Sequence, residues 1–233
     1  YNSVLDYPES PAVVIAKYKL AWCHINKKDF NQAIKLFESC VSAEITNDLD
    51  IDTYRSVDIK LEAFIDMAYC YPECYKEATP EHAIEYFKKY AWSSPVYTIV
   101  LEKLAYRYFV KSKWEHASVI YRKLSDLQHD PGKLIEYAKN TLECVQAMGK
   151  FEDADRDMAH IITALKLQKY SVHVAEDEKQ KNLLEFEKYA RNIATRLHDR
   201  ARKSGSVENF RCAAESYKLY RDFFEESPVT KDM

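Results

Sequence analysis

Glycine and proline are scarce in this chain, which holds only 3 Gly and 7 Pro among 233 residues. Both interrupt helices, proline because it lacks the amide hydrogen and glycine because its backbone is conformationally free. Their scarcity, together with 47% hydrophobic and 30% charged residues, indicates a strongly helix-prone chain. No apolar run approaches the roughly 20 residues of a membrane-spanning helix. The sequence therefore predicts no membrane span.

An excess of charge of one sign is also missing. The chain carries 34 basic and 37 acidic side chains, which gives a formal net charge of −3. A nucleic-acid-binding protein needs a basic face to displace counterions from the phosphates, so the balanced charge argues against nucleic acid as a partner. The one basic cluster, from Arg196 to Lys203, is interrupted by Asp199. We interpret it as a solvated helix end, where cations are favourable.

Local motifs for catalysis, metals and cofactors are absent from the sequence. No glycine-rich phosphate loop occurs, and no Ser-His-Asp or Cys-His arrangement has the context of a motif. Cys70 and Cys74 lack a histidine at ligand spacing. The acidic segment 47–52 is followed by Thr53, where a calcium loop requires glycine. We expect no metal, no cofactor and no enzymatic activity.

The six cysteines are even in number, which raises the question of disulfides. Cys23, Cys70 and Cys144 occupy equivalent positions in a repeated pattern described below, where small residues pack between helices. We interpret them as small hydrophobic residues. A Cys70–Cys74 disulfide remains an alternative if the protein resides in an oxidising compartment.

The sequence does contain a pattern that occurs four times: a small or apolar pair, followed by an alanine and a large side chain on the next predicted helix. A gap of thirteen residues separates the two parts in three of the four copies, and thirty-four residues separate Ala83 from Ala117. Such periods are typical of stacked helical hairpins. The four copies are Leu20-Ala21 with Ala33 and Phe37, Met67-Ala68 with Ala83 and Phe87, Leu104-Ala105 with Ala117 and Tyr121, and Thr141-Leu142 with Ala154 and Met158.

The pattern predicts an all-α fold, a right-handed α/α superhelix that forms a single domain over 1–233. Asp29 is expected to cap a helix, Gly149 to end one, and 72–79 to form a turn. Because the chain begins at Tyr1 and not with methionine, we expect it to be a fragment of a longer protein. About five helical hairpins are expected, the last one elongated, at residues 12–45, 56–91, 96–127, 132–170 and 176–226.

Two of these hairpins resemble tetratricopeptide repeats. The resemblance lies in Tyr18-Lys19-Leu20-Ala21-Trp22 with Ala33 and Phe37, and in Leu101-Glu102-Lys103-Leu104-Ala105-Tyr106 with Trp114, Ala117 and Tyr121. It implies a superhelix that binds protein partners rather than catalysing a reaction.

A narrower resemblance concerns the middle of the chain. The order Glu62-Ala63-Phe64-Ile65-Asp66, His82-Ala83-Ile84-Glu85-Tyr86-Phe87-Lys88-Lys89 and Leu101-Glu102-Lys103-Leu104-Ala105 is similar to long tetratricopeptide proteins of the envelope of gliding and predatory deltaproteobacteria. This similarity implies an adaptor of an envelope or motility assembly in the periplasm. A cytoplasmic location is the alternative.

The repeat resemblance also implies a binding surface. In such repeats the first helix of each hairpin lines a concave groove. The copies of the pattern that begin at Leu20, Met67 and Leu104 lie on such helices, and the residue two positions after each of these points into the groove. An aromatic groove of this kind could hold a peptide or a helix of a partner, with the aromatic residues as energetic anchors. The alternatives are that these rings pack between helices, or that the chain is a structural spacer of a longer solenoid without a ligand of its own. The predicted groove residues are Tyr18, Trp22, Ile25, Tyr69, Tyr106 and Phe109.

Overall fold

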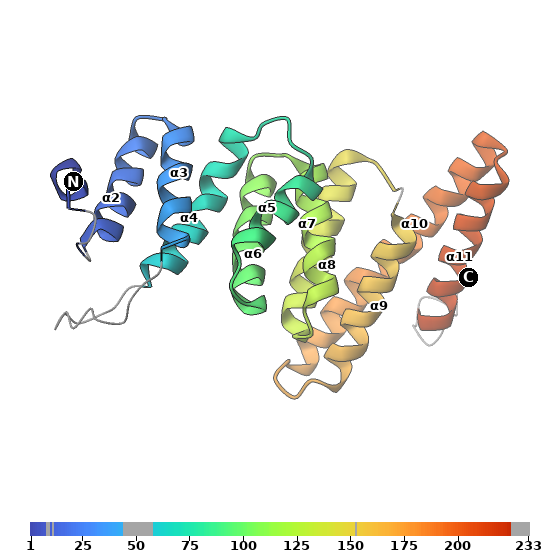
Figure 1. Ribbon diagram of the computed structural model, residues 1–233. Helices are drawn as coiled ribbons and strands as arrows, with labels where there is room; N and C mark the ends of the chain where they lie inside the picture. Colours follow the sequence, from blue (N-terminus) through green and yellow to red (C-terminus); the bar gives the residue numbers. More distant parts are fainter. Residues whose placement is uncertain (8–9, 11, 44–57, 152, 225–233) are drawn as a thin grey trace. The chain divides into compact units, whose positions relative to one another are not determined.

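The computed structural model describes residues 1–7, 10, 12–43, 58–151 and 153–224, and this part of the chain is built from helices (Figure 1). It contains eleven helices, and the described residues form no strand. The predicted all-α class is therefore confirmed. The chain separates into two compact units, Tyr1–Ile120 and Tyr121–Met233, with the boundary inside helix α7. The acidic segment 47–52 lies outside the described residues.

Unit 1 contains the helices that carry the predicted groove residues. Helix α2 contacts α3 and α4, α3 contacts α4, and α4 and α5 each contact α6. Consecutive helices thus pack as neighbours, as expected for hairpins that stack along the chain. The helices are α1 (Asn2–Leu5), α2 (Ala12–Asn26), α3 (Phe30–Val41), α4 (Ile59–Cys74), α5 (Pro80–Tyr90), α6 (Ser94–Val110) and the first half of α7 (Trp114–Leu127).

Several helices begin at a residue whose side chain satisfies a free amide of the first turn. Asp29 accepts a hydrogen bond from the backbone N–H of Gln32, which confirms the predicted cap. In the same way Asp58 caps α4, Thr79 caps α5 and Ser93 caps α6. Asp130 caps α8 (Pro131–Met148). These local contacts set the helix starts because the first four amides of a helix have no partner within it.

The end of α4 differs from the prediction. The turn expected at 72–79 begins only at Tyr75, because α4 continues through Pro72 into its last turn. A proline removes one backbone hydrogen bond and crowds the preceding turn, which usually breaks a helix. Here Tyr71 and Pro72 are buried, and the N–H of Tyr75 still bonds to the carbonyl of Tyr71 at 2.9 Å. Burial of this turn offsets the lost hydrogen bond.

The repeated pattern marks the contacts between helices. The alanines of the second helix in each copy, Ala33, Ala83, Ala117 and Ala154, are at most 2% exposed. The large side chains that follow them, Phe37, Phe87, Tyr121 and Met158, are at most 3% exposed. A small residue allows two helices to approach, and a large neighbour fills the remaining space. The interpretation of the pattern as a packing signal is therefore consistent with the observed burial.

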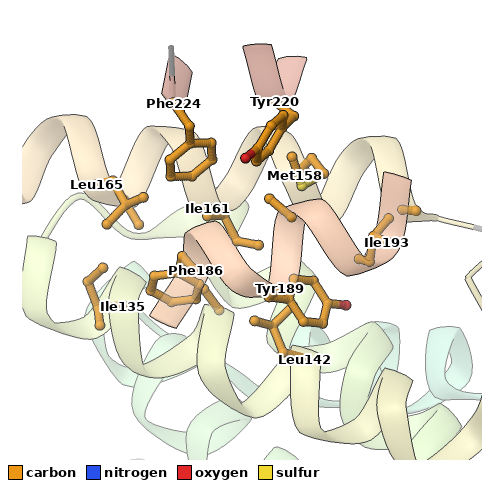
Figure 2. Close-up of a cluster of buried hydrophobic side chains, with 14 of the residues drawn as sticks. Ile135, Leu142, Met158, Ile161, Leu165, Phe186, Tyr189, Ile193, Tyr220 and Phe224 are labelled. Atoms are coloured by element: carbon orange, nitrogen blue, oxygen red, sulfur yellow. The ribbon is translucent and has the colours of Figure 1, made fainter. Parts of the chain in front are cut away.

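Unit 2 is organised around one hydrophobic cluster contributed by α8, α9, α10 and α11 (Figure 2). Phe186 of α10 and Ile161 of α9 are buried in it, and Phe224 closes it at the end of α11. Gly149 ends α8 in the left-handed conformation, at φ 66°, as predicted. The helices are α8 (Pro131–Met148), α9 (Ala154–Tyr170), α10 (Glu176–Ser204) and α11 (Val207–Phe224).

The lengths of the helices can be compared with the predicted fifth hairpin and with the length that a membrane span requires. Helix α10 has 29 residues and packs against α11, so this hairpin is elongated, as expected. In the part of the chain that is described, no helix is both long and apolar enough to cross a membrane.

Candidate functional site

Three large aromatic side chains are exposed on neighbouring helices of unit 1. Trp22 of α2 is 37% exposed, Tyr69 of α4 38% and Tyr106 of α6 62%. Each follows an alanine that is buried against another helix, so the next residue, about 100° further around the helix, faces outward. Because α2 contacts α4 and α4 contacts α6, the three residues belong to adjacent helices. We call Trp22, Tyr69 and Tyr106 the aromatic row.

A single carboxylate joins the first helix of the row to the second. The hydroxyl of Tyr18 and the indole N–H of Trp22 both donate to Oδ2 of Asp66, each at 2.9 Å. Tyr18 and Trp22 are four residues apart on α2 and share one of its faces, which allows both to reach the same oxygen of α4. The ring of Tyr18 also packs on Phe37, with centroids 5.7 Å apart. Trp22 is thus held in one orientation.

The carboxyl group of Asp66 is electrostatically unusual. Burial raises its pKa to about 6, although the hydrogen bonds from Tyr18 and Trp22 act to lower it, and the nearby carboxylate of Glu62 raises it further. No Lys, Arg or His among the described residues forms an ion pair with Asp66. The aromatic donors are therefore its main stabilising partners. Burial likewise raises the pKa of Tyr18 to about 12.

A cation joins the second helix of the row to the third. The guanidinium carbon of Arg107 lies 4.0 Å from the ring centroid of Tyr69, a cation–π contact between α6 and α4. Arg107 also contacts Glu73 at 3.4 Å, and Lys111 pairs with the same carboxylate. The hydrogen bond from Lys111 is the largest influence that lowers the pKa of Glu73. These contacts fix the Tyr69 ring while leaving part of it exposed.

The remaining predicted groove residues differ in their accessibility. Phe109 is half-buried and packs edge-on against Trp114, with centroids 5.2 Å apart. Ile25 is only 8% exposed and belongs to the core. This placement corrects its assignment to the groove: Ile25 lies one turn after the buried Ala21, on the face that packs within the unit.

Sequence reasoning missed the polar residues that orient the aromatic row. Asp66, Glu73 and Arg107 were not among the predicted residues, although Asp66 directly precedes the Met67 of the repeated pattern. Their position on the first helices of hairpins was the available signal. Their partners could not be inferred, because those partners lie 34 to 48 residues away in the sequence.

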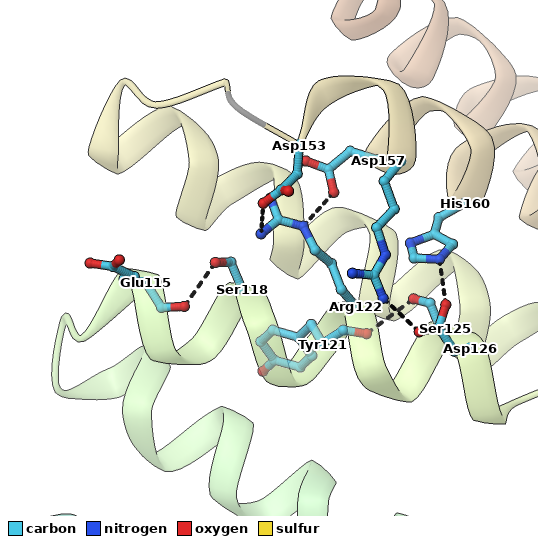
Figure 3. A network of polar contacts seen from close by, with 10 residues as sticks. Glu115, Ser118, Tyr121, Arg122, Ser125, Asp126, Asp153, Asp157 and His160 are labelled. Carbon is cyan, nitrogen blue, oxygen red and sulfur yellow. Dashed lines mark hydrogen bonds and ion pairs between the residues drawn. The ribbon is translucent and has the colours of Figure 1, made fainter. Parts of the chain in front are cut away.

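A buried ion pair in unit 2 is the other prominent polar feature (Figure 3). Arg122 binds Asp157 through two hydrogen bonds of 2.7 and 2.8 Å, and its Nη1 contacts Asp153 at 2.9 Å. Both members of the Arg122–Asp157 pair are almost inaccessible to solvent. Such a closed, paired arrangement joins α7 to α9 and gives a substrate no access to the charges.

All six cysteines are free thiols, and Cys40, Cys70 and Cys144 are buried. Burial raises the pKa of each of these three, to about 11 for Cys40 and about 12 for the other two, which disfavours the reactive thiolate. Across the ranges that the structure describes, no group of three His, Cys, Asp or Glu side chains is arranged to hold a metal ion.

Comparisons with known proteins do not place this chain in a family: no family model matches it, and no curated protein is significantly similar to it.

Proposed function

We propose that this protein is a non-catalytic interaction module whose aromatic row binds a peptide or helix of a partner protein. The proposal rests on one observation: Trp22, Tyr69 and Tyr106 are exposed on three adjacent helices, at equivalent positions of the repeated pattern. Partly exposed tryptophan and tyrosine are the residues that most often supply the binding energy of protein interfaces.

The orientation of these rings supports the same proposal. Trp22 is fixed by its hydrogen bond to Asp66, and Tyr69 by its contact with Arg107. A side chain that is already ordered loses little conformational entropy when a partner binds. Rings that served only to fill space between helices would be buried, as Phe37 and Phe87 are.

The proposed architecture is a stack of tetratricopeptide-like hairpins in unit 1. It is supported by the contacts of α2 with α4 and of α4 with α6, which pair the first helices of successive hairpins. From the sequence resemblance we further propose that the partner belongs to a bacterial envelope or motility assembly.

A two-step experiment tests the binding surface. The photoreactive amino acid p-benzoylphenylalanine replaces Tyr106 in the protein expressed in its native cells, and the cross-linked partner segment is identified by mass spectrometry. That segment is then synthesised, and its affinity for the purified protein is measured by fluorescence anisotropy. We expect Trp22→Ala/Tyr106→Ala to weaken binding at least about tenfold, because two aromatic anchors are removed.

The matched control is Trp92→Ala/Tyr217→Ala, which removes a partly exposed tryptophan and a partly exposed tyrosine outside the row. Its affinity for the peptide should equal that of the unmodified protein. Equal affinity of the two double variants would refute the aromatic row as the binding surface. The absence of any cross-link at position 106 would favour a structural spacer instead.

A further inference from the structure

Unit 2 contains a cavity that is separate from the aromatic row. It has a volume of about 600 Å³ and lies where the last turns of α9, the first turns of α10 and the end of α11 meet. This volume is typical of small-molecule sites, which range from roughly 300 to 1,000 Å³. The cavity borders the hydrophobic cluster, since Leu165 and Phe224 belong to both (Figure 2).

The lining of this cavity is apolar on one side. Leu165 and Phe224 are buried members of the cluster, and Leu183 and Phe223 pack against it as partly buried residues. Aliphatic and aromatic carbon is therefore accessible from within the cavity. Such a surface favours a ligand that carries an apolar chain.

The charged side chains of the lining are mostly positive. Among the described residues, Lys166, Lys169 and Lys179 line the cavity together with one acidic residue, Glu176. Lys179 pairs with Glu176 at 3.4 Å. Within the described part of the chain, no carboxylate pairs with Lys166 or Lys169, and the ammonium of Lys166 lies over the ring of Phe223 at 5.9 Å. The described lining of the cavity thus places positive charge beside an apolar wall.

The side-chain amide of Gln168 adds a further polar group to the lining. Gln168 is only 2% exposed, and it lines the cavity. Its side chain forms no hydrogen bond with any other described residue. An amide in this position that has no protein partner is available to hydrogen-bond a ligand or water in the cavity.

We propose that this cavity binds a free aliphatic carboxylate, a fatty acid of medium length. Its carboxylate accepts hydrogen bonds from the amide of Gln168 and from the ammonium groups of Lys166 and Lys169, and its chain packs against Leu165 and Leu183. No single feature would suffice for this assignment. The apolar wall, the unpaired lysines and the unsatisfied amide together select an anion with a hydrocarbon tail.

Isothermal titration calorimetry with laurate, below its micellar concentration at pH 7.5, tests the site in the full chain. We expect one laurate per chain. In Lys166→Glu/Lys169→Glu the dissociation constant should rise at least tenfold, since two attractive charges become repulsive. The matched control, Lys203→Glu/Lys218→Glu, makes the same charge change at exposed positions outside the cavity and should leave the affinity unchanged.

Further titrations separate the roles of charge, chain and amide. Acetate lacks the chain and dodecyltrimethylammonium has the opposite charge, so neither should bind at the concentrations used for laurate. Gln168→Leu keeps the lysines but removes the amide, and should weaken laurate binding at least about fivefold. The proposal is overturned if laurate does not bind, if dodecyltrimethylammonium binds equally well, or if both lysine double variants have the same affinity. An unchanged affinity of Gln168→Leu would remove the amide from the site.

Discussion

At the scale of single residues, Asp66 combines structural and electrostatic roles. It is half-buried, and it accepts two hydrogen bonds from aromatic donors of another helix. Its charge is poorly solvated, which is why its pKa is raised to about 6. The residue therefore orients Trp22 through a carboxylate that folding removes in part from water.

A change of stability with pH follows from this raised pKa. The folded value of about 6 exceeds the ordinary value of 3.8, so the protonated form is favoured by folding. The stability that this group contributes is fully present below about pH 4 and is lost as the pH rises through 6. Asp66→Asn imitates the neutral form. We expect it to stabilise the protein by on the order of 1 kcal/mol at pH 7.5, after allowance for solvent screening, and by almost nothing at pH 4.

Urea unfolding of both proteins at several pH values between 4 and 7.5 measures this difference. Asp199→Asn, at an exposed position of unit 2, controls for the loss of one negative charge. A stability difference between Asp66→Asn and the parent protein that does not depend on pH would contradict the assignment.

At the scale of elements, helices are joined mainly by packing and at a few places by buried polar contacts. The pair of Arg122 and Asp157 is the most enclosed of these, and it connects α7 with α9. A buried ion pair contributes little net stability compared with a well-packed apolar pair, but loss of one partner leaves the other charge uncompensated.

Removal of one partner should consequently lower the free energy of unfolding more than removal of both. We expect Arg122→Met, which leaves the buried carboxylate of Asp157 without its guanidinium partner, to lower the free energy of unfolding by roughly 3 kcal/mol. Arg122→Met/Asp157→Leu should recover at least half of that loss. Chemical denaturation measures both values. The exposed pair of Arg211 and Glu208 is a natural comparison, and Glu208→Gln should leave the stability nearly unchanged. A double variant that is less stable than Arg122→Met would show that the pair itself is strongly stabilising.

At the scale of the whole molecule, the chain separates into two compact units, each with its own buried residues. Most contacts between helices join elements that are close in sequence, as in repeat proteins. Stability in such chains is largely local. A defect in one unit should therefore affect that unit first.

The buried Phe186 of unit 2 allows this locality to be tested. We expect Phe186→Ala to destabilise unit 2 by about 3–5 kcal/mol through the cavity it creates. Hydrogen exchange followed by mass spectrometry should show faster exchange in α8 to α11, with α2 to α6 unchanged. Equal loss of protection in both units would mean that the chain unfolds as one cooperative body.

Local signals explain why much of the fold could be predicted. Helical spacing of apolar residues, caps such as Asp29 and the glycine stop at Gly149 act within a few residues, so they can be read directly from the sequence. The end of α4 was predicted too early. Proline has a strong local preference, and burial of Tyr71 and Pro72 against other helices overrides it.

Signals within the sequence were enough to predict the helical class, the buried alanines and aromatic residues of the repeated pattern, and Trp22, Tyr69 and Tyr106 as candidates for one surface. Folding had to be known to see that Ile25 is buried and that Asp66 and Arg107 orient the aromatic row. The same holds for Gln168, which has no hydrogen-bond partner among the described residues and lines a cavity with three lysines. The reason is physical: helix formation depends on neighbours in the chain, whereas the exposure, hydrogen bonding and pKa of a side chain depend on residues that only folding brings together.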